Sequence, residues 1–108
     1  MDLQALLTKL RAMAEKIDVS AVDFLAVQIN LKDMNPGTFY IEVKDHRISI
    51  EPYEYIDRSC MLTLSYDSFN KLIDGKLDPV AAYTIGKLKV DGDLGKALEF
   101  SNLIKQAG

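Results

Sequence analysis

The sequence predicts an α+β fold, in which helices pack on one face of a mainly antiparallel sheet of about five strands. Two patterns predict it. Apolar residues recur at helical spacing near the N-terminus and again in the last third of the chain, whereas apolar and polar residues alternate through the middle. Such alternation is typical of a sheet that packs on one face and is solvated on the other. The 108 residues suffice for a single domain, 1–108, with a core of its own.

The N-terminal segment predicts an amphipathic helix preceded by Asp2. Its apolar stripe covers roughly 120° of the helix surface. The stripe consists of Leu3, Leu6, Leu7, Leu10, Met13, Ala14 and Ile17. Ser20 and Asp23 then form a pattern close to a capping box, which predicts a brief second helix before alternation begins near Ala26.

Five segments of alternating character predict strands. Their apolar positions lie in 27–31, 39–43, 48–50, 60–64 and 88–90. The first four are separated by turns at 33–37 and 45–46 and by a longer loop at 51–59. This order predicts an antiparallel meander of the first four strands. We expect the polar face to be solvated and to lie outside any ligand site. Its residues are Gln28, Asn30, Tyr40, Glu42, Ser49 and Thr63.

Helical spacing returns in 66–75, 78–86 and 93–105. Gly75 and Gly86 end the first two helices, and Asp93 is placed to cap the last. The last helix has an unusually wide apolar surface of roughly 220°, about twice what packing on one sheet face requires. It therefore has two apolar neighbours, of which one is the core and the other is either more protein or a ligand. The residues are Leu94, Ala97, Leu98, Phe100, Leu103 and Ile104.

The glycine-rich stretch GKLKVDGDLGKAL, residues 86–98, fits none of the ligand loops that it resembles in its letters. Leu88 stands where a phosphate loop needs Ser or Thr. Gly95 stands where a calcium loop needs an acid. The GXXG at 92–95 carries Asp93, which would repel a nucleic-acid phosphate, and the net charge of −3 also argues against nucleic acid. We therefore expect this stretch to be structural.

No catalytic set, metal site or cofactor is predicted, and we expect no enzyme activity. His46 is the only histidine and has no cysteine or paired acids near it in sequence. Cys60 alternates with leucines, as a buried small hydrophobe would. In the longer loop, Tyr53, Tyr55 and Ile56 either fasten the loop or form an apolar rim.

Several absences predict a cytoplasmic protein. No apolar run approaches the ~20 residues of a membrane span. The N-terminus lacks the features of a secretory signal, and the single cysteine fits a reducing compartment. The C-terminal KQAG is not a peroxisomal signal.

The segment GKLDPVAAYTIGKLKVDGDLGKALEFSNLI, residues 75–104, resembles the signature region of the sterol carrier protein type two domain, also called the non-specific lipid-transfer domain. In that family a GKL-x-P turn precedes a short helix, and GKLKI-x-G precedes a capped helix. Residues 60–76 resemble the family's strand and following helix, and residues 37–50 resemble its central hairpin. The resemblance implies an apolar pocket between the sheet and the C-terminal helices.

The resemblance also implies a set of lipid-binding residues. They are Phe69, Ala82, Tyr83, Ile85, Leu94 and Leu98. Ile85 stands where the family often has glutamine, so a polar group that could meet a ligand head group is lost. The leucines at 94 and 98 replace methionines that are frequent in the family, which makes the pocket stiffer.

The function implied is non-catalytic binding and carriage of a lipid, such as a fatty acid, an acyl-CoA or a sterol-like molecule. The expected partners are that ligand and, transiently, a membrane surface, with no nucleic acid and no cofactor. The protein is expected to be a monomer or a weak homodimer. The alternative is an accessory module for protein contact, with a vestigial cavity, working beside a lipid- or acyl-handling enzyme.

Overall fold

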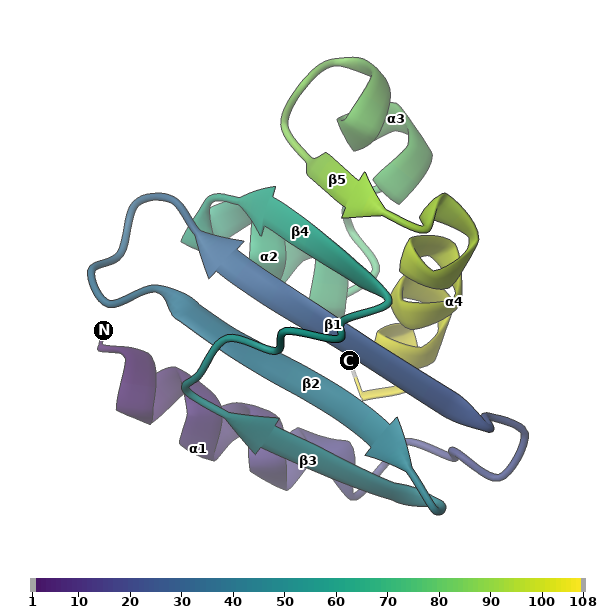
Figure 1. Ribbon diagram of the computed structural model, residues 1–108. Coiled ribbons are helices and arrows are strands. Elements are labelled where there is room, and N and C mark those ends of the chain that lie inside the picture. Colours follow the sequence, from purple (N-terminus) through teal and green to yellow (C-terminus); the bar gives the residue numbers. More distant parts are fainter. Residues whose placement is uncertain (1, 108) are drawn as a thin grey trace.

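The computed structural model describes residues 2–107, which form an α+β fold (Figure 1). In chain order the elements are α1 (Leu3–Ala14), β1 (Phe24–Leu31), β2 (Thr38–Lys44), β3 (Arg47–Glu51), β4 (Cys60–Leu64), α2 (Tyr66–Ile73), α3 (Pro79–Thr84), β5 (Lys89–Gly92), α4 (Leu94–Ile104) and a 3-10 turn at Lys105–Ala107. The predicted fold class is confirmed.

The strands form one mixed sheet in the order β3-β2-β1-β4-β5. Three pairings are antiparallel, and β1 pairs with β4 in parallel. The prediction of a mainly antiparallel sheet is therefore confirmed, whereas the predicted four-stranded meander is wrong. The physical reason is the loop of residues 52–59, which carries the chain across β2 and β1 before β4 begins (Figure 1). We call this segment the crossover loop.

The crossover loop covers part of the polar face of the sheet. The Tyr55 backbone N–H donates to Gln28 Oε1 at 3.1 Å, and the Tyr55 hydroxyl donates to Glu42 Oε2 at 2.6 Å. The Ser59 N–H donates to the Ala26 carbonyl at 2.7 Å. Gln28 is only 3% exposed. The expectation that water satisfies this face is therefore wrong at Gln28, where the loop backbone takes the place of solvent.

Helices α1, α2 and α4 pack on the opposite, apolar face, as predicted (Figure 1). The core between them and the sheet includes three fully buried phenylalanines, Phe39, Phe69 and Phe100. The rings of Phe39 and Phe69 meet edge to face with centroids 5.6 Å apart, which joins β2 to α2. The short helix α3 lies next to the edge strand β5 (Figure 1).

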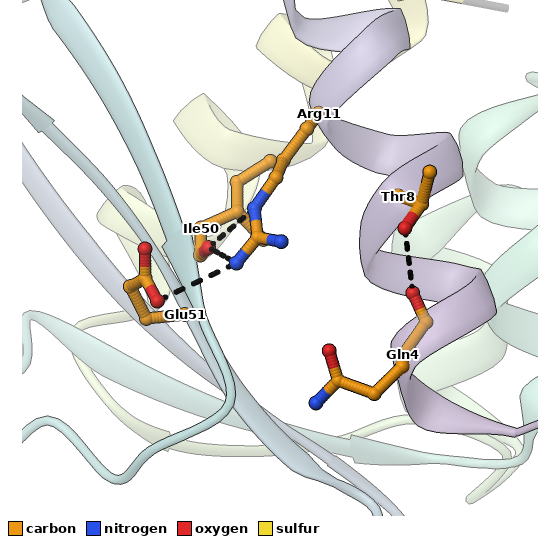
Figure 2. Close-up of polar contacts among 5 residues, drawn as sticks. All are labelled: Gln4, Thr8, Arg11, Ile50 and Glu51. Atoms are coloured by element: carbon orange, nitrogen blue, oxygen red, sulfur yellow. Dashed lines mark hydrogen bonds and ion pairs between the residues drawn. The ribbon is translucent and has the colours of Figure 1, made fainter.

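Helix α1 is fixed at its start and near its end. Asp2 Oδ1 accepts a 2.8 Å hydrogen bond from the Ala5 N–H, which confirms the predicted N-terminal boundary. Near the C-terminal end, Arg11 Nε and Nη2 donate to the Ile50 carbonyl at 3.0 and 2.7 Å, and Nη2 lies 3.4 Å from Glu51 Oε2 (Figure 2). These contacts hold α1 against the edge strand β3.

The predicted second helix at Ser20–Asp23 is wrong, because these residues form a turn followed by the start of β1. Asp18 Oδ1 accepts the Ser20 N–H at 3.0 Å, and this backbone hydrogen bond lowers the pKa of Asp18. The Val22 N–H donates to the Val19 carbonyl, and both valines are buried. The local acid thus stabilises a turn here rather than a helix.

Candidate functional site

An apolar cavity of about 190 Å³ lies between α3, α4 and the edge of the sheet formed by β4 and β5. Strands β4 and β5 meet in register there, with Leu62 opposite Val90. The residues that line the cavity are Leu62, Leu72, Pro79, Val80, Tyr83, Leu88, Val90, Leu94, Ala97, Leu98 and Ser101. The wall therefore combines two strands with three helices, α2, α3 and α4.

Two local signals set the bounds of α3, which forms one side of the cavity. At its start, Asp78 Oδ1 accepts the Val80 N–H at 3.0 Å. At its end, Gly86 adopts φ +82°, a left-handed conformation that favours glycine. The chain then turns back, and the Leu88 N–H donates to the Ala82 carbonyl at 3.2 Å. This return brings Leu88 into the cavity wall.

The start of α4 is set by Gly92 and Asp93. Gly92 has φ +105°, and a Cβ atom there would lie 2.9 Å from the Ser59 carbonyl oxygen. The Asp93 N–H donates to the same oxygen at 3.1 Å, and Asp93 Oδ1 accepts the Lys96 N–H at 3.1 Å. The predicted cap at Asp93 is thus confirmed, Gly92 forms the turn before it, and the glycine-rich stretch positions α4 along the cavity.

The cavity wall is buried on one side and open on the other. Leu62, Leu72 and Ser101 are at most 1% exposed. Tyr83 and Leu98, in contrast, are 47% and 43% exposed. The first three residues therefore lie at its depth, and the last two lie at its mouth.

The structure separates the six residues named by the resemblance. Tyr83, Leu94 and Leu98 line the cavity. Phe69 and Ala82 are buried in the core and are not among the lining residues. Ile85, which follows α3, is 66% exposed and does not line the cavity either.

Sequence reasoning missed most of the wall, above all Ser101. A signal for it exists, because 94, 97, 98 and 101 follow the i, i+3, i+4, i+7 spacing of one helix face. Because serine is polar, it was not counted among the residues of that apolar face. For the strands, alternation placed Leu62 and Val90 on apolar faces but could not indicate that the two strands pair.

The charges of the chain lie elsewhere. No charged side chain is among the residues that line the cavity, and no group of acids, histidines and cysteines suited to a metal ion occurs within residues 2–107. Cys60 is buried outside the cavity, and burial, with a contribution from Asp93, raises the pKa of its thiol to about 11. Across the same residues, the helices are all too short or too polar to span a membrane. Because no charged side chain lines it, the cavity can shelter an apolar group from water.

The fold and cavity define an α+β domain that encloses an apolar space between its sheet and C-terminal helices. The chain belongs to the SCP-2 sterol transfer family, whose model matches residues 3–105. The resemblance found in the sequence is confirmed.

Individual relatives agree with this assignment. The chain is 34% identical to human sterol carrier protein 2 over 72 residues, which cover 67% of this chain and 13% of that protein. It thus spans about an eighth of the length of that relative. Among solved structures, UbiJ-SCP2 ubiquinone synthesis protein superposes with a TM-score of 0.77 at 15% identity, covering 99% of this chain and 95% of that one. Palmitated SCP2L2 from Aedes aegypti gives a TM-score of 0.61 at 14% identity, covering 96% and 95%. At these identities the two structures show a shared fold.

Proposed function

We propose that residues 1–108 act as one lipid-binding domain, which holds part of a fatty acid, acyl-CoA or sterol-like ligand in the cavity. The observation that carries this proposal is the wall itself, with buried leucines at depth and half-exposed apolar side chains at the mouth. Transfer of each methylene from water to such a wall is worth about 0.8 kcal/mol. Membership of the family and the palmitated state of the mosquito relative support a ligand with an apolar chain.

The cavity volume supports partial enclosure of a long ligand. About 190 Å³ is below the roughly 300–1,000 Å³ of typical small-molecule sites. A long chain would therefore extend past the mouth, where Val80 of α3 is exposed. Ile85, directly after α3, is exposed as well. We propose that Tyr83, Leu94 and Leu98 contact the ligand directly and that Ile85 contacts it outside the mouth. Phe69 and Ala82 pack behind the wall and support it.

We further propose that the domain carries its ligand without changing it chemically. The polar side chains of the wall are the hydroxyls of Tyr83 and Ser101, and no catalytic base is among the lining residues. The exposed apolar side chains of α3 suit transient contact with a membrane surface, from which a lipid can move into an equally apolar cavity at little net cost. We propose action in the cytoplasm, as a monomer or weak homodimer.

The test is to purify the protein without detergent and identify bound lipid by mass spectrometry after denaturation. Fluorescent fatty acids, acyl-CoAs and sterols are then titrated into delipidated protein. We expect micromolar affinity and little selectivity for the head group, because no charged side chain lines the cavity. Leu98→Asp should abolish binding by placing a charge at the mouth, whereas Ile56→Asp, on the crossover loop, should not.

Absence of bound lipid together with absence of binding would contradict the proposal. If such a protein also associated as its concentration rose, the accessory-module alternative would be favoured instead.

A further inference from the structure

Ala97 has the smallest side chain among the residues that line the cavity. On the same helix, Leu94 and Leu98 are 48% and 43% exposed, whereas Ala97 is 7% exposed. Its methyl group therefore lies deeper in the wall than the two leucines at the mouth. A larger side chain at this position would take up space inside the cavity.

The cavity opens on one side and ends at the core. Its exposed side chains all come from α3 and α4, so the mouth lies between these two helices. They are Val80, Tyr83, Leu94 and Leu98. At depth, Leu62 and Leu72 are at most 1% exposed and belong to the core cluster. An apolar chain that enters between the helices therefore meets packed side chains after a limited distance.

The wall has little freedom to adapt to a larger ligand. No methionine is among the lining residues, and methionine is the side chain that most readily fills an irregular space. The caps at Asp78 and Asp93 fix the starts of the two helices that form the mouth. The volume of the cavity therefore sets how much of a ligand is enclosed.

The volume corresponds to a small number of carbon atoms. An apolar cavity of about 150 Å³ accepts benzene, which is a six-carbon ring. By the same ratio, a cavity of about 190 Å³ accepts roughly eight carbon atoms. Further carbons of a longer chain lie outside the mouth, where they touch half-exposed side chains and stay partly in water.

We propose that the cavity selects lipids by a medium-length or compact apolar part of roughly eight carbon atoms, and that Ala97 sets this limit. This inference rests on the proposed lipid-binding function and names the class of ligand within it. Each enclosed methylene raises affinity about fourfold, whereas each methylene outside the mouth raises it by less than about twofold. A medium-chain fatty acid thus gains most of the affinity that a long-chain fatty acid gains.

The test is a series of saturated fatty acids, from hexanoic to tetradecanoic acid, kept below their micelle concentrations. Each displaces cis-parinaric acid, a fluorescent polyene fatty acid, from delipidated protein. No charged side chain lines the cavity, so the carboxylate stays at or outside the mouth in every member of the series. For the native protein we expect affinity to rise about fourfold per methylene up to roughly octanoic acid and by less than about twofold per methylene beyond it.

Variants that fill or enlarge the cavity should move this break in opposite directions. Ala97→Val and Ala97→Leu add carbons to the wall and should weaken octanoic acid by about tenfold or more, as loss of two or three enclosed methylenes predicts. Leu88→Ala removes three carbons from the wall and should move the break to chains about three carbons longer. Ala81→Leu, at an exposed position of α3 that does not line the cavity, is the matched control and should leave the series unchanged.

Thermal melts establish that each variant is folded before it is titrated, and Ala97→Val carries the test if the larger leucine prevents folding. If affinity in the native protein rises about fourfold at every step up to tetradecanoic acid, the inference is wrong and lipid binding stands. The same holds if a folded Ala97 variant binds octanoic acid as the native protein does. If the native protein binds neither cis-parinaric acid nor any member of the series, the proposed function itself is wrong.

Discussion

The hydroxyl of Tyr55 donates a 2.6 Å hydrogen bond to Glu42 Oε2, which ties the crossover loop to strand β2. The Tyr55 ring also meets the Tyr40 ring edge to face, with centroids 5.1 Å apart. Tyr53 and Ile56 of the same loop are 64% and 88% exposed. Of the two alternatives that the sequence left open, fastening of the loop therefore holds for Tyr55, whereas Tyr53 and Ile56 remain at the surface.

Replacement of Tyr55 by Phe should lower the free energy of unfolding by about 1–2 kcal/mol, since the lost bond has a charged acceptor but is only partly buried. Urea denaturation measures this change. Tyr53→Phe, at an exposed position of the same loop, is the control and should leave stability unchanged. Equal stability of the two variants would contradict a fastening role for Tyr55.

The contribution of Tyr55 should also depend on pH. The hydrogen bond to Glu42, followed by burial, raises the pKa of Tyr55 from its ordinary value of 10.0 to about 12. The folded state therefore holds a proton that the unfolded state loses above pH 10, so stability from this group is complete below pH 10 and is lost between pH 10 and 12. Melting temperatures of native protein and Tyr55→Phe, measured in that range, should converge as the pH rises.

Cys60 should resist alkylation in the folded protein. The side chain is 1% exposed, and burial raises the pKa of its thiol from 9.0 to about 11, so little thiolate forms near neutral pH. Iodoacetamide at pH 8 should modify the native protein far more slowly than the urea-unfolded protein, as followed by mass spectrometry. Comparable rates in the two states would show that Cys60 is accessible and overturn its assignment as a buried hydrophobe.

Local signals in the sequence predicted helix boundaries well. Asp93 is the predicted cap of α4, and Asp2 and Asp78 mark the predicted starts of α1 and α3. All three act as caps, because a cap needs only a side-chain oxygen near the N–H groups two or three residues ahead. The same reasoning failed at Ser20, where Asp18 stabilises a competing turn. A local pattern cannot reveal which of two nearby acids or hydroxyls accepts the backbone hydrogen bond, and so whether a helix or a turn begins there.

Long-range pairing was not predictable from alternation. The pattern correctly indicated which side chains of β1 and β4 lie on the apolar face. Alternation along one strand does not specify, however, which strand pairs with it or whether the two run parallel. The parallel β1–β4 pair depends on the crossover loop, whose hydrogen bonds to Gln28 and Ala26 join residues far apart in sequence. The cavity depends in turn on where β4 and β5 lie, so most of its wall could not be predicted either.

Gly92 and Gly86 offer a matched pair for testing how β5 and α4 are joined. Both have positive φ, but a Cβ at Gly92 would lie 2.9 Å from the Ser59 carbonyl oxygen, whereas a Cβ at Gly86 meets nothing within 4 Å. Gly86→Ala should therefore cost only conformational strain, roughly 1–2 kcal/mol. Gly92→Ala should cost more, because backbone must also move. Chemical denaturation of both variants tests the order, and a larger loss for Gly86→Ala would contradict it.

The two apolar sides of α4 should separate by phenotype. Leu98 is 43% exposed at the cavity mouth, whereas Ile104, on the same helix, is 4% exposed in the core. Ile104→Ala should lower the free energy of unfolding by about 2–5 kcal/mol, the usual range for truncation of a core residue. Leu98→Ala should cost little, because its truncation enlarges a space that is already open to solvent, but it should change lipid affinity.

Thermal melts and titrations with a fluorescent fatty acid, made on the same two variants, decide this. Thr63→Ala is the control, at a partly buried position on the other face of β4. It should bind lipid within about twofold of the native protein, because it removes no hydrogen bond to the ligand, which would be worth about 1 kcal/mol. If Leu98→Ala melts as early as Ile104→Ala and binds lipid normally, Leu98 belongs to the core and the ligand lies elsewhere. If Thr63→Ala loses binding while it remains stable, the ligand lies on the polar face of the sheet.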